Sequence, residues 1–292
     1  MDVGVNLCFA IKRWPEPEQW ARIVADELGV ASVQFTMDLI DPWWPADLRA
    51  AMAVRARSEA AARGIAIHSV QIGLAGYTYN GLLHPDAAAR GIAEDWWRRS
   101  IDMAAELGAR AVGGPVGALS VADAASPERR AALYAEVVER LGHLAGHAAD
   151  AGLEALLVEP TPLPREIPST IEEARRLVAD TSGGAVPILF VLDVGHALYR
   201  PLYGEDASLV PWLAELRDSI GVLHLQNHDY RADAHWGWPD ARGAYDPAGF
   251  FREVRDAGLE DVPVFIEVFS PFEQADEEIL PLIRSSLTAC RG

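Results

Sequence analysis

Short apolar runs alternate with longer amphipathic segments along the whole chain. The runs are nearly continuous stretches of Val, Ile and Leu, which is typical of strands in a parallel sheet that helices cover. Between them, apolar residues recur with helical spacing, for example at residues 17–29 and 95–108. We predict strands at residues 3–10, 31–37, 65–73, 109–117, 154–160, 188–196, 222–229 and 262–270.

Glycine marks the carboxyl ends of several predicted helices. Because glycine tolerates the left-handed backbone conformation, it commonly follows the last helical turn. Such residues stand just before a predicted strand at Gly29, Gly64, Gly108, Gly152 and Gly258.

The number and spacing of these units favour one fold. Eight units in 292 residues average about 36 residues each, close to the length expected for a (β/α)8 barrel. An open, doubly wound sheet also alternates strands and helices, but no Gly-rich phosphate loop follows the first predicted strand. We therefore predict a single α/β domain over residues 1–292, a (β/α)8 TIM barrel. The long loop at 230–247 is expected to form a lid or rim.

Composition narrows the class of protein. With 25 Lys and Arg against 43 Asp and Glu, the net charge is −18, which argues against a nucleic-acid partner. The two cysteines, Cys8 and Cys290, lie far apart and form no disulfide framework, which favours a cytoplasmic location. A secretion signal and a run of 18 apolar residues are both absent from the sequence, so no membrane association is expected.

Ionisable residues occur at the ends of four successive predicted strands. These are Glu159, Asp193, His224 and Glu267. Each alone would more often be a cap, an ion-pair partner or a buried core residue than a ligand. In a barrel, however, they converge at one mouth, where buried carboxylates repel each other unless a cation is present. Three carboxylates and one imidazole suit a divalent metal such as Mn²⁺, Mg²⁺ or Co²⁺.

The segments around these residues resemble the xylose isomerase-like barrels, a superfamily of sugar isomerases and epimerases. The matching segments are LLVEPT, FVLDVGHAL, GVLHLQNHD and FIEVFSPFE. In the ketose 3-epimerase branch, the resemblance implies that the same four residues bind the metal, with Mn²⁺ expected first. It also implies that Glu159 and Glu267 exchange a proton across the sugar and that His196 contacts substrate oxygens.

Two positions depart from that branch. Arg165 stands where the branch usually has Glu, and Tyr230, followed by Arg231, stands where it usually has Arg. Because both positions help to bind free ketohexose in that branch, Arg165, Arg231 and Arg242 are candidate ligands for a phosphate or carboxylate instead. The segment VFIEVFSPFE is similar to epimerases and isomerases of phosphorylated tetruloses.

Further candidate substrate contacts come from the predicted strands and loops. His68 points either into the barrel core or toward the mouth, and Asn6 is either a core amide or a donor to a sugar hydroxyl. Trp14 and Trp236 fall in or beside loops, where an aromatic ring stacks on a sugar or packs against the protein.

These residues predict proton transfer next to a carbonyl, in which two glutamates act as acid and base on a metal-bound ketose or ketose phosphate. The expected partner is a small carbohydrate, and the resemblance suggests a homodimer or homotetramer. Two alternatives remain open. A lyase or dehydratase acting on a keto-sugar or inosose shares the same first step, and a non-catalytic sugar-binding barrel keeps the fold alone.

Overall fold

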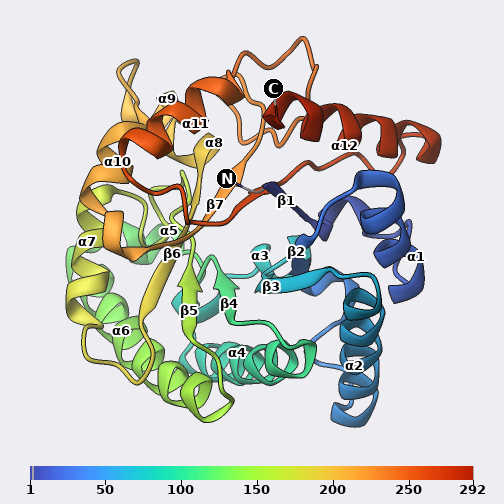
Figure 1. The fold of residues 1–292 in the computed structure, drawn as a ribbon. Coiled ribbons are helices and arrows are strands. Elements are labelled where there is room, and N and C mark those ends of the chain that lie inside the picture. Colours follow the sequence, from blue (N-terminus) through green and yellow to red (C-terminus); the bar gives the residue numbers. More distant parts are fainter. Residues whose placement is uncertain (2, 292) are drawn as a thin grey trace.

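The computed structural model, which describes Met1 and residues 3–291, shows eight strands that close into a barrel in chain order (Figure 1). Every neighbouring pair is parallel, including β8 with β1, so the predicted (β/α)8 TIM barrel is confirmed. The strands are β1 (Val3–Asn6), β2 (Ser32–Thr36), β3 (Ala66–Gln71), β4 (Ala111–Gly114), β5 (Ala155–Val158), β6 (Ile188–Asp193), β7 (Ile220–Leu225) and β8 (Val264–Ile266).

Several strands end earlier than the apolar runs predict, because a polar side chain starts a helical turn. The Asn6 side chain accepts from the backbone N–H of Cys8 at the start of a 3₁₀ helix, η1 (Leu7–Ala10). Asp193 accepts from the backbone N–H groups of Gly195 and His196 and caps the short helix α8 (Val194–Ala197). Such caps satisfy backbone donors that would otherwise lack a partner.

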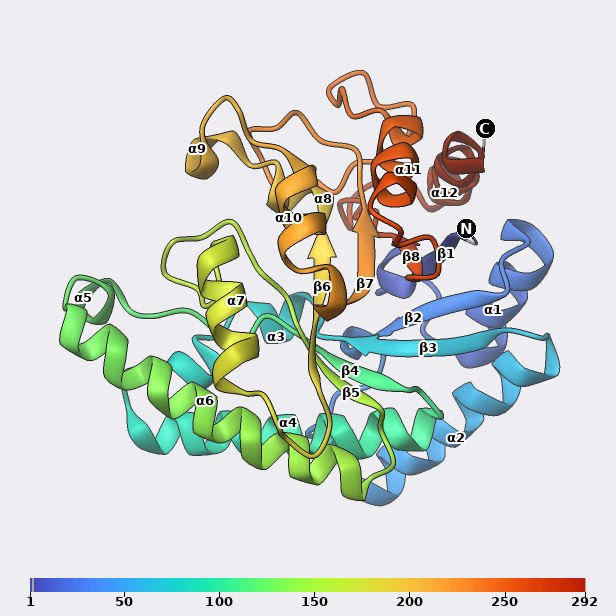
Figure 2. The ribbon, with the colours of Figure 1, turned by 60° about the vertical axis from the view of Figure 1, so that its left-hand side comes forward.

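Helices surround the barrel on its outside (Figures 1 and 2). Besides η1 and α8, the helices are α1 (Pro17–Arg22), η2 (Ile23–Leu28), η3 (Met37–Leu39), α2 (Ala46–Ala62), α3 (Leu74–Tyr77), η4 (Gly81–Leu83), α4 (Ala87–Leu107), α5 (Val121–Ala124), α6 (Pro127–Asp150), α7 (Ile171–Asp180), α9 (Arg200–Tyr203), α10 (Leu209–Glu215), η5 (Arg217–Ser219), α11 (Pro247–Asp256) and α12 (Asp276–Arg291). Gly29 and Gly108 follow η2 and α4 in the left-handed conformation, as predicted.

Two apolar clusters hold the fold together. The larger one lies between the barrel and the helices, and the smaller one contains Leu157, Val191, Val222 and Phe265. Each of these four stands two residues before a member of the predicted metal site, so it points to the same side of its strand. Burial of each such side chain contributes about 1.5–3 kcal/mol. The inner cluster therefore forms an apolar floor beneath the polar site.

The loop between β7 and α11, residues 226–246, contains no helix and is held by a bridge between Asn227 and Trp236. It lies at the end of the barrel toward which the β6 and β7 arrows point in Figure 2. This position agrees with the predicted lid or rim.

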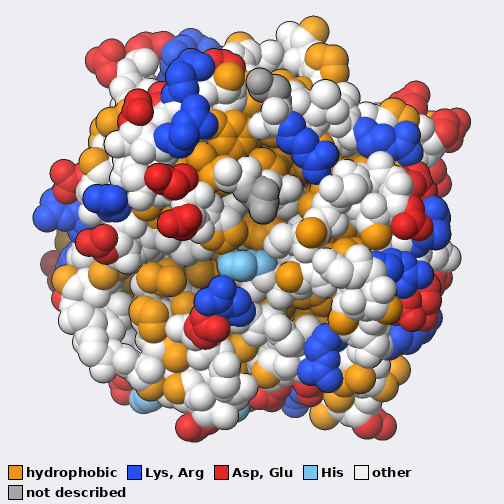
Figure 3. All heavy atoms as spheres, in the orientation of Figure 1, with side chains coloured by type: hydrophobic (Ala, Val, Ile, Leu, Met, Phe, Trp, Pro, Cys, Tyr) orange, Lys and Arg blue, Asp and Glu red, His pale blue; other side chains and the backbone are white. Residues whose placement is uncertain are grey.

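The outer surface carries charges of both signs. On the face shown in Figure 3, Lys and Arg side chains lie interspersed with Asp and Glu side chains. Pairs such as Arg55 with Glu18 have both side chains about half exposed, so solvent screens the attraction between them. In the part of the chain that the structure describes, no helix is long and apolar enough to cross a membrane.

Candidate metal and active site

The four residues predicted to bind a metal lie together at the carboxyl ends of β5 to β8. Asp193 and His224 are partners in the β6–β7 register, and Glu159 and Glu267 directly follow β5 and β8. All four are buried, and one ligand atom from each lies within 4.8 Å of the others. We call these four residues the acidic cluster. It is the group of carboxylates and one imidazole that the strand ends predict.

In the acidic cluster, one ring nitrogen of His224 faces an oxygen of each carboxylate. His224 Nδ1 lies 2.9 Å from Glu267 Oε2, 3.7 Å from Glu159 Oε1 and 4.0 Å from Asp193 Oδ2. Neither His224 Nδ1 nor Asp193 Oδ2 has a hydrogen-bond partner, although both are buried. Buried polar atoms without partners are costly, and their convergence fits a cation among them.

Three neutral amides from the opposite strands orient the acidic cluster. Gln71 Nε2 donates to Glu159 Oε2 at 2.6 Å, and Asn6 Nδ2 donates to Glu267 Oε1 at 2.8 Å. Gln34 Oε1 lies 2.6 Å from His224 Nε2, which fits a proton on Nε2 and a lone pair on Nδ1. We call Asn6, Gln34 and Gln71 the amide set. Such contacts around metal ligands fix their orientation.

The buried carboxylates of the acidic cluster repel one another, and their pKa values are shifted. Burial raises the pKa of Glu159 to about 7, while the imidazoles of His196 and His224 oppose this shift and Glu267 adds to it. Burial also disfavours the charged form of Glu267, but His224, His235 and His196, in their protonated forms, together outweigh it and lower the pKa of Glu267 below its ordinary value. A bound cation would relieve this repulsion directly.

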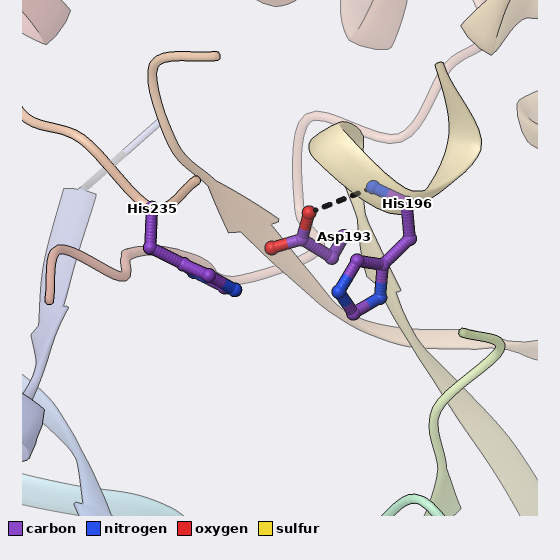
Figure 4. A group of neighbouring side chains, drawn as sticks. All are labelled: Asp193, His196 and His235. Atoms are coloured by element: carbon purple, nitrogen blue, oxygen red, sulfur yellow. Dashed lines mark hydrogen bonds between the residues drawn. The ribbon is translucent and has the colours of Figure 1, made fainter. Parts of the chain in front are cut away.

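A second group shares Asp193 with the acidic cluster. Asp193, His196 and His235 also place ligand atoms within 4.8 Å of one another. Figure 4 shows Asp193 between the two imidazole rings, with the backbone N–H of His196 donating to Asp193 Oδ1 at 3.1 Å. Asp233 joins the two rings, 3.2 Å from His196 Nε2 and 2.9 Å from His235 Nε2.

Asp233 and His235 are site residues that sequence reasoning missed. They lie in the loop 226–246, outside any strand, so no strand-end pattern marks them. The available signal was the pair of ionisable residues within the loop already expected to cover the mouth. The loop therefore supplies charged side chains to the site as well as a cover.

His196, a predicted substrate contact, lies beside the acidic cluster. It is buried, and its Nδ1 lies 3.5 Å from Glu159 Oε1 and 3.1 Å from the Pro160 carbonyl oxygen. Arg242 and Trp236 both line a cavity beside the mouth. The Arg242 guanidinium lies 4.4 Å from the Trp236 ring centre and pairs with Asp240.

The other predicted contacts have partners outside the acidic cluster. Arg165 donates to the Leu119 carbonyl, Arg231 pairs with Glu205 at the surface, and Trp14 packs against Phe9. Sequence alone could not reveal these partners, because they are distant along the chain.

His68 lies toward the opposite end of the barrel. Its carbonyl accepts from the backbone N–H of Arg110, which precedes β4, and its ring contacts Phe265. Burial and the Arg110 guanidinium lower the pKa of His68. Of the two placements that the sequence left open, the structure supports the barrel core, because the ring meets Phe265 of the inner apolar cluster and β3 continues to Gln71, three residues further on.

Glu166 is a further carboxylate that the sequence comparison missed, because it directly follows Arg165. It is buried, accepts from the Thr161 hydroxyl, and has a pKa that burial raises. Thr161 stands two residues after Glu159, so this hydrogen bond places Glu166 beside the site.

A family model described as "Xylose isomerase-like TIM barrel" matches residues 23–285. The chain belongs to the xylose isomerase-like TIM barrel family. The resemblance found from the strand-end motifs is thus confirmed at the level of the family.

Individual relatives agree with this assignment. D-erythrulose 1-phosphate 3-epimerase of Brucella abortus (strain 2308) is 25% identical, over 98% of this chain and 94% of the relative. A candidate xylose isomerase from Rhodospirillum rubrum is 38% identical, with a TM-score of 0.96 over 100% of this chain and 98% of the other. D-psicose 3-epimerase from Clostridium cellulolyticum H10 shares the fold, with 16% identity and a TM-score of 0.74 over 100% and 98% of the two chains. Sugar isomerases and epimerases among the relatives support the same class of enzyme here.

Proposed function

We propose that this enzyme is a divalent-metal-dependent epimerase or isomerase of a ketose or ketose phosphate. The observation that carries the proposal is the convergence of Glu159, Asp193, His224 and Glu267, with buried atoms of Asp193 and His224 left open toward one another. The relative from Brucella abortus, named as an epimerase of a tetrulose phosphate, supports the substrate class.

The acidic cluster would hold the metal, with Mn²⁺ expected first and Mg²⁺ or Co²⁺ as alternatives. When bound, the cation supplies Lewis-acid stabilisation of negative charge on the substrate oxygens. Asn6 and Gln71 each bind one oxygen of a glutamate and leave the other oxygen facing His224. The two glutamates are thus held in fixed orientations for proton transfer.

The proton moves between carbon and carboxylate. One glutamate removes the proton next to the substrate carbonyl, and the other returns a proton to the opposite face of the same carbon, which inverts it. Return of the proton to the neighbouring carbon instead gives aldose–ketose isomerisation. We propose His196 as a substrate contact, together with Arg242 and Trp236 at the rim.

Proton exchange in D₂O tests this function. The Mg²⁺-loaded protein, which avoids the line broadening of Mn²⁺, is incubated with ketoses and ketose phosphates and followed by ¹H NMR. We expect loss of the proton next to the carbonyl, a new epimer or aldose, and no exchange after chelation. In the same samples, metal at about 100 times its Kd should stabilise the fold by about 2.7 kcal/mol, seen as a higher Tm.

Other outcomes separate the alternatives. Exchange followed by elimination would identify a lyase, and metal binding without exchange on any substrate would favour a non-catalytic barrel. Full exchange in the chelated protein would reject the metal. The homodimeric or homotetrameric state and the cytoplasmic location stay predictions.

A further inference from the structure

A large cavity adjoins the acidic cluster on the other half of the barrel mouth. It measures about 680 Å³ and lies over the carboxyl ends of β2, β3 and β4, which Met37, Ile72 and Pro115 follow directly. Ile72 follows Gln71, whose amide donates to Glu159, so the cavity begins beside the acidic cluster, and Glu166 forms part of its wall. This volume is within the range of pockets that hold drug-sized ligands, which is more than a four-carbon chain needs. We call it the first cavity.

Aromatic side chains form much of the wall of the first cavity. Trp43, Tyr77, Tyr79 and Trp96 line it, and Trp43 and Tyr79 remain 43% and 70% exposed. The Arg99 guanidinium lies 4.9 Å from the Trp43 ring centre and is not part of the lining. Exposed aromatic rings beside polar groups suit a ligand with flat apolar faces and hydroxyl edges, as a sugar ring has.

The charged groups of the first cavity are acidic. Asp38, Asp41 and Glu166 line it, whereas His84 is the one imidazole and neither Lys nor Arg occurs among the described lining residues. Asp38 is engaged by the backbone N–H groups of Leu74 and Ala75. Carboxylates without a partner cation disfavour a phosphate group but accept hydrogen bonds from hydroxyls.

The second cavity, about 540 Å³ in volume, differs in charge. Arg242 and Asp240 line it as an ion pair, and the Lys12 ammonium lies 4.5 Å from the ring centre of Phe272, another lining residue. Leu74 of the short helix α3 lines the second cavity, whereas Tyr77 of the same helix lines the first. The helix therefore stands between an acidic, aromatic space and a space whose wall carries charges of both signs.

We propose that the first cavity binds a neutral sugar ring attached to the ketose, so that the enzyme's substrate is a glycosylated ketose. This inference rests on the proposed function, since the reacting carbons must lie at the acidic cluster. The attached ring stacks on Trp43 and Tyr79, and its hydroxyls donate to the carboxylates of the wall.

Three sugars that differ at one position test the substrate class. They are fructose, fructose 6-phosphate and 6-O-glucosyl-fructose, each titrated into the Mg²⁺-loaded protein by isothermal calorimetry. We expect the disaccharide to bind about tenfold more tightly than fructose, because it adds aromatic stacking, and the phosphate ester to gain nothing. Preferred binding of the phosphate ester, or equal binding of all three sugars, would overturn the proposal.

Matched variants locate the binding. Trp43→Ala and Tyr79→Ala should remove the advantage of the disaccharide and leave fructose binding unchanged. Phe272→Ala, which removes an aromatic ring of similar exposure (44%) from the second cavity, should change none of the three affinities. Loss of disaccharide binding in Phe272→Ala but not in Trp43→Ala would refute the first cavity. Trp43-dependent binding without proton exchange in D₂O would reject the proposed function and keep the cavity assignment.

Discussion

The two halves of the barrel mouth differ in the kind of polar group they supply. Strands β5 to β8 supply the ionisable acidic cluster, whereas β1 to β3 supply the neutral amide set. An amide donates to a carboxylate without adding charge, so it orients the group while leaving its charge for a cation. The ionisable residues and the amides that orient them therefore come from different groups of strands, which meet where β8 pairs with β1.

The largest loss of activity is expected from a substitution in the acidic cluster. Glu267→Gln keeps the size of the side chain but removes the carboxylate, so kcat should fall about 10²–10⁴-fold, as for loss of a general base. Turnover is measured by proton exchange at saturating metal, so that weaker metal binding does not mimic the loss. Circular dichroism and Tm should show an intact fold.

Glu260→Gln is the matched control, because Glu260 is an exposed glutamate at the opposite end of the same strand region. It should keep full activity. Full activity in Glu267→Gln as well would contradict proton transfer by two glutamates.

A smaller effect is expected in the amide half. Gln71→Leu removes the hydrogen bond to Glu159 Oε2, so kcat or metal affinity should fall about 10–100-fold, as for other residues that orient metal ligands. The fall should appear in kcat and in the pH profile, with KM little changed, because Gln71 acts through Glu159. A purely structural role would lower Tm without moving the pH profile.

Gln19→Leu is the control for Gln71→Leu. It makes the same substitution at an exposed glutamine of α1, outside the amide set. An equal loss of activity in both variants would contradict a specific role for the Gln71 amide.

The smallest effect is expected away from the mouth, between α4 and α6. A hydrogen bond from Arg90, opposed by partial burial and aided by Arg140, lowers the pKa of Glu136 to about 2. Its stabilising contribution is therefore full above about pH 4.5, the ordinary value, and is lost as the pH falls toward 2. Because the pair is partly exposed, Glu136→Gln should cost no more than about 1 kcal/mol at pH 7.

Urea unfolding of wild type and Glu136→Gln at pH 7 and pH 3 measures this contribution. The difference should shrink at the lower pH, and activity should be unchanged at pH 7. Glu139→Gln, an exposed neighbour on the same helix, should show no such pH dependence. A difference that stays constant with pH would mean that the charge of Glu136 is not responsible.

The members of the acidic cluster were predictable because each stands at the end of an apolar run. Val191 and Asp193, for example, point to the same side of β6 by the period of two along a strand. Asn6 had two open interpretations, and the sequence could not show that its amide donates to Glu267, 261 positions away. His68 also had two, because an apolar run does not show where its strand ends.

Strand periodicity and chain order are local properties, so they were enough to predict the fold class and the four converging ionisable residues. Asp233 and His235 enter the site, Arg165 and Arg231 find other partners, and an acidic aromatic cavity forms beside it, and none of this follows from local pattern. Loop conformations depend on contacts between residues distant in sequence, and those contacts form only once the barrel has closed.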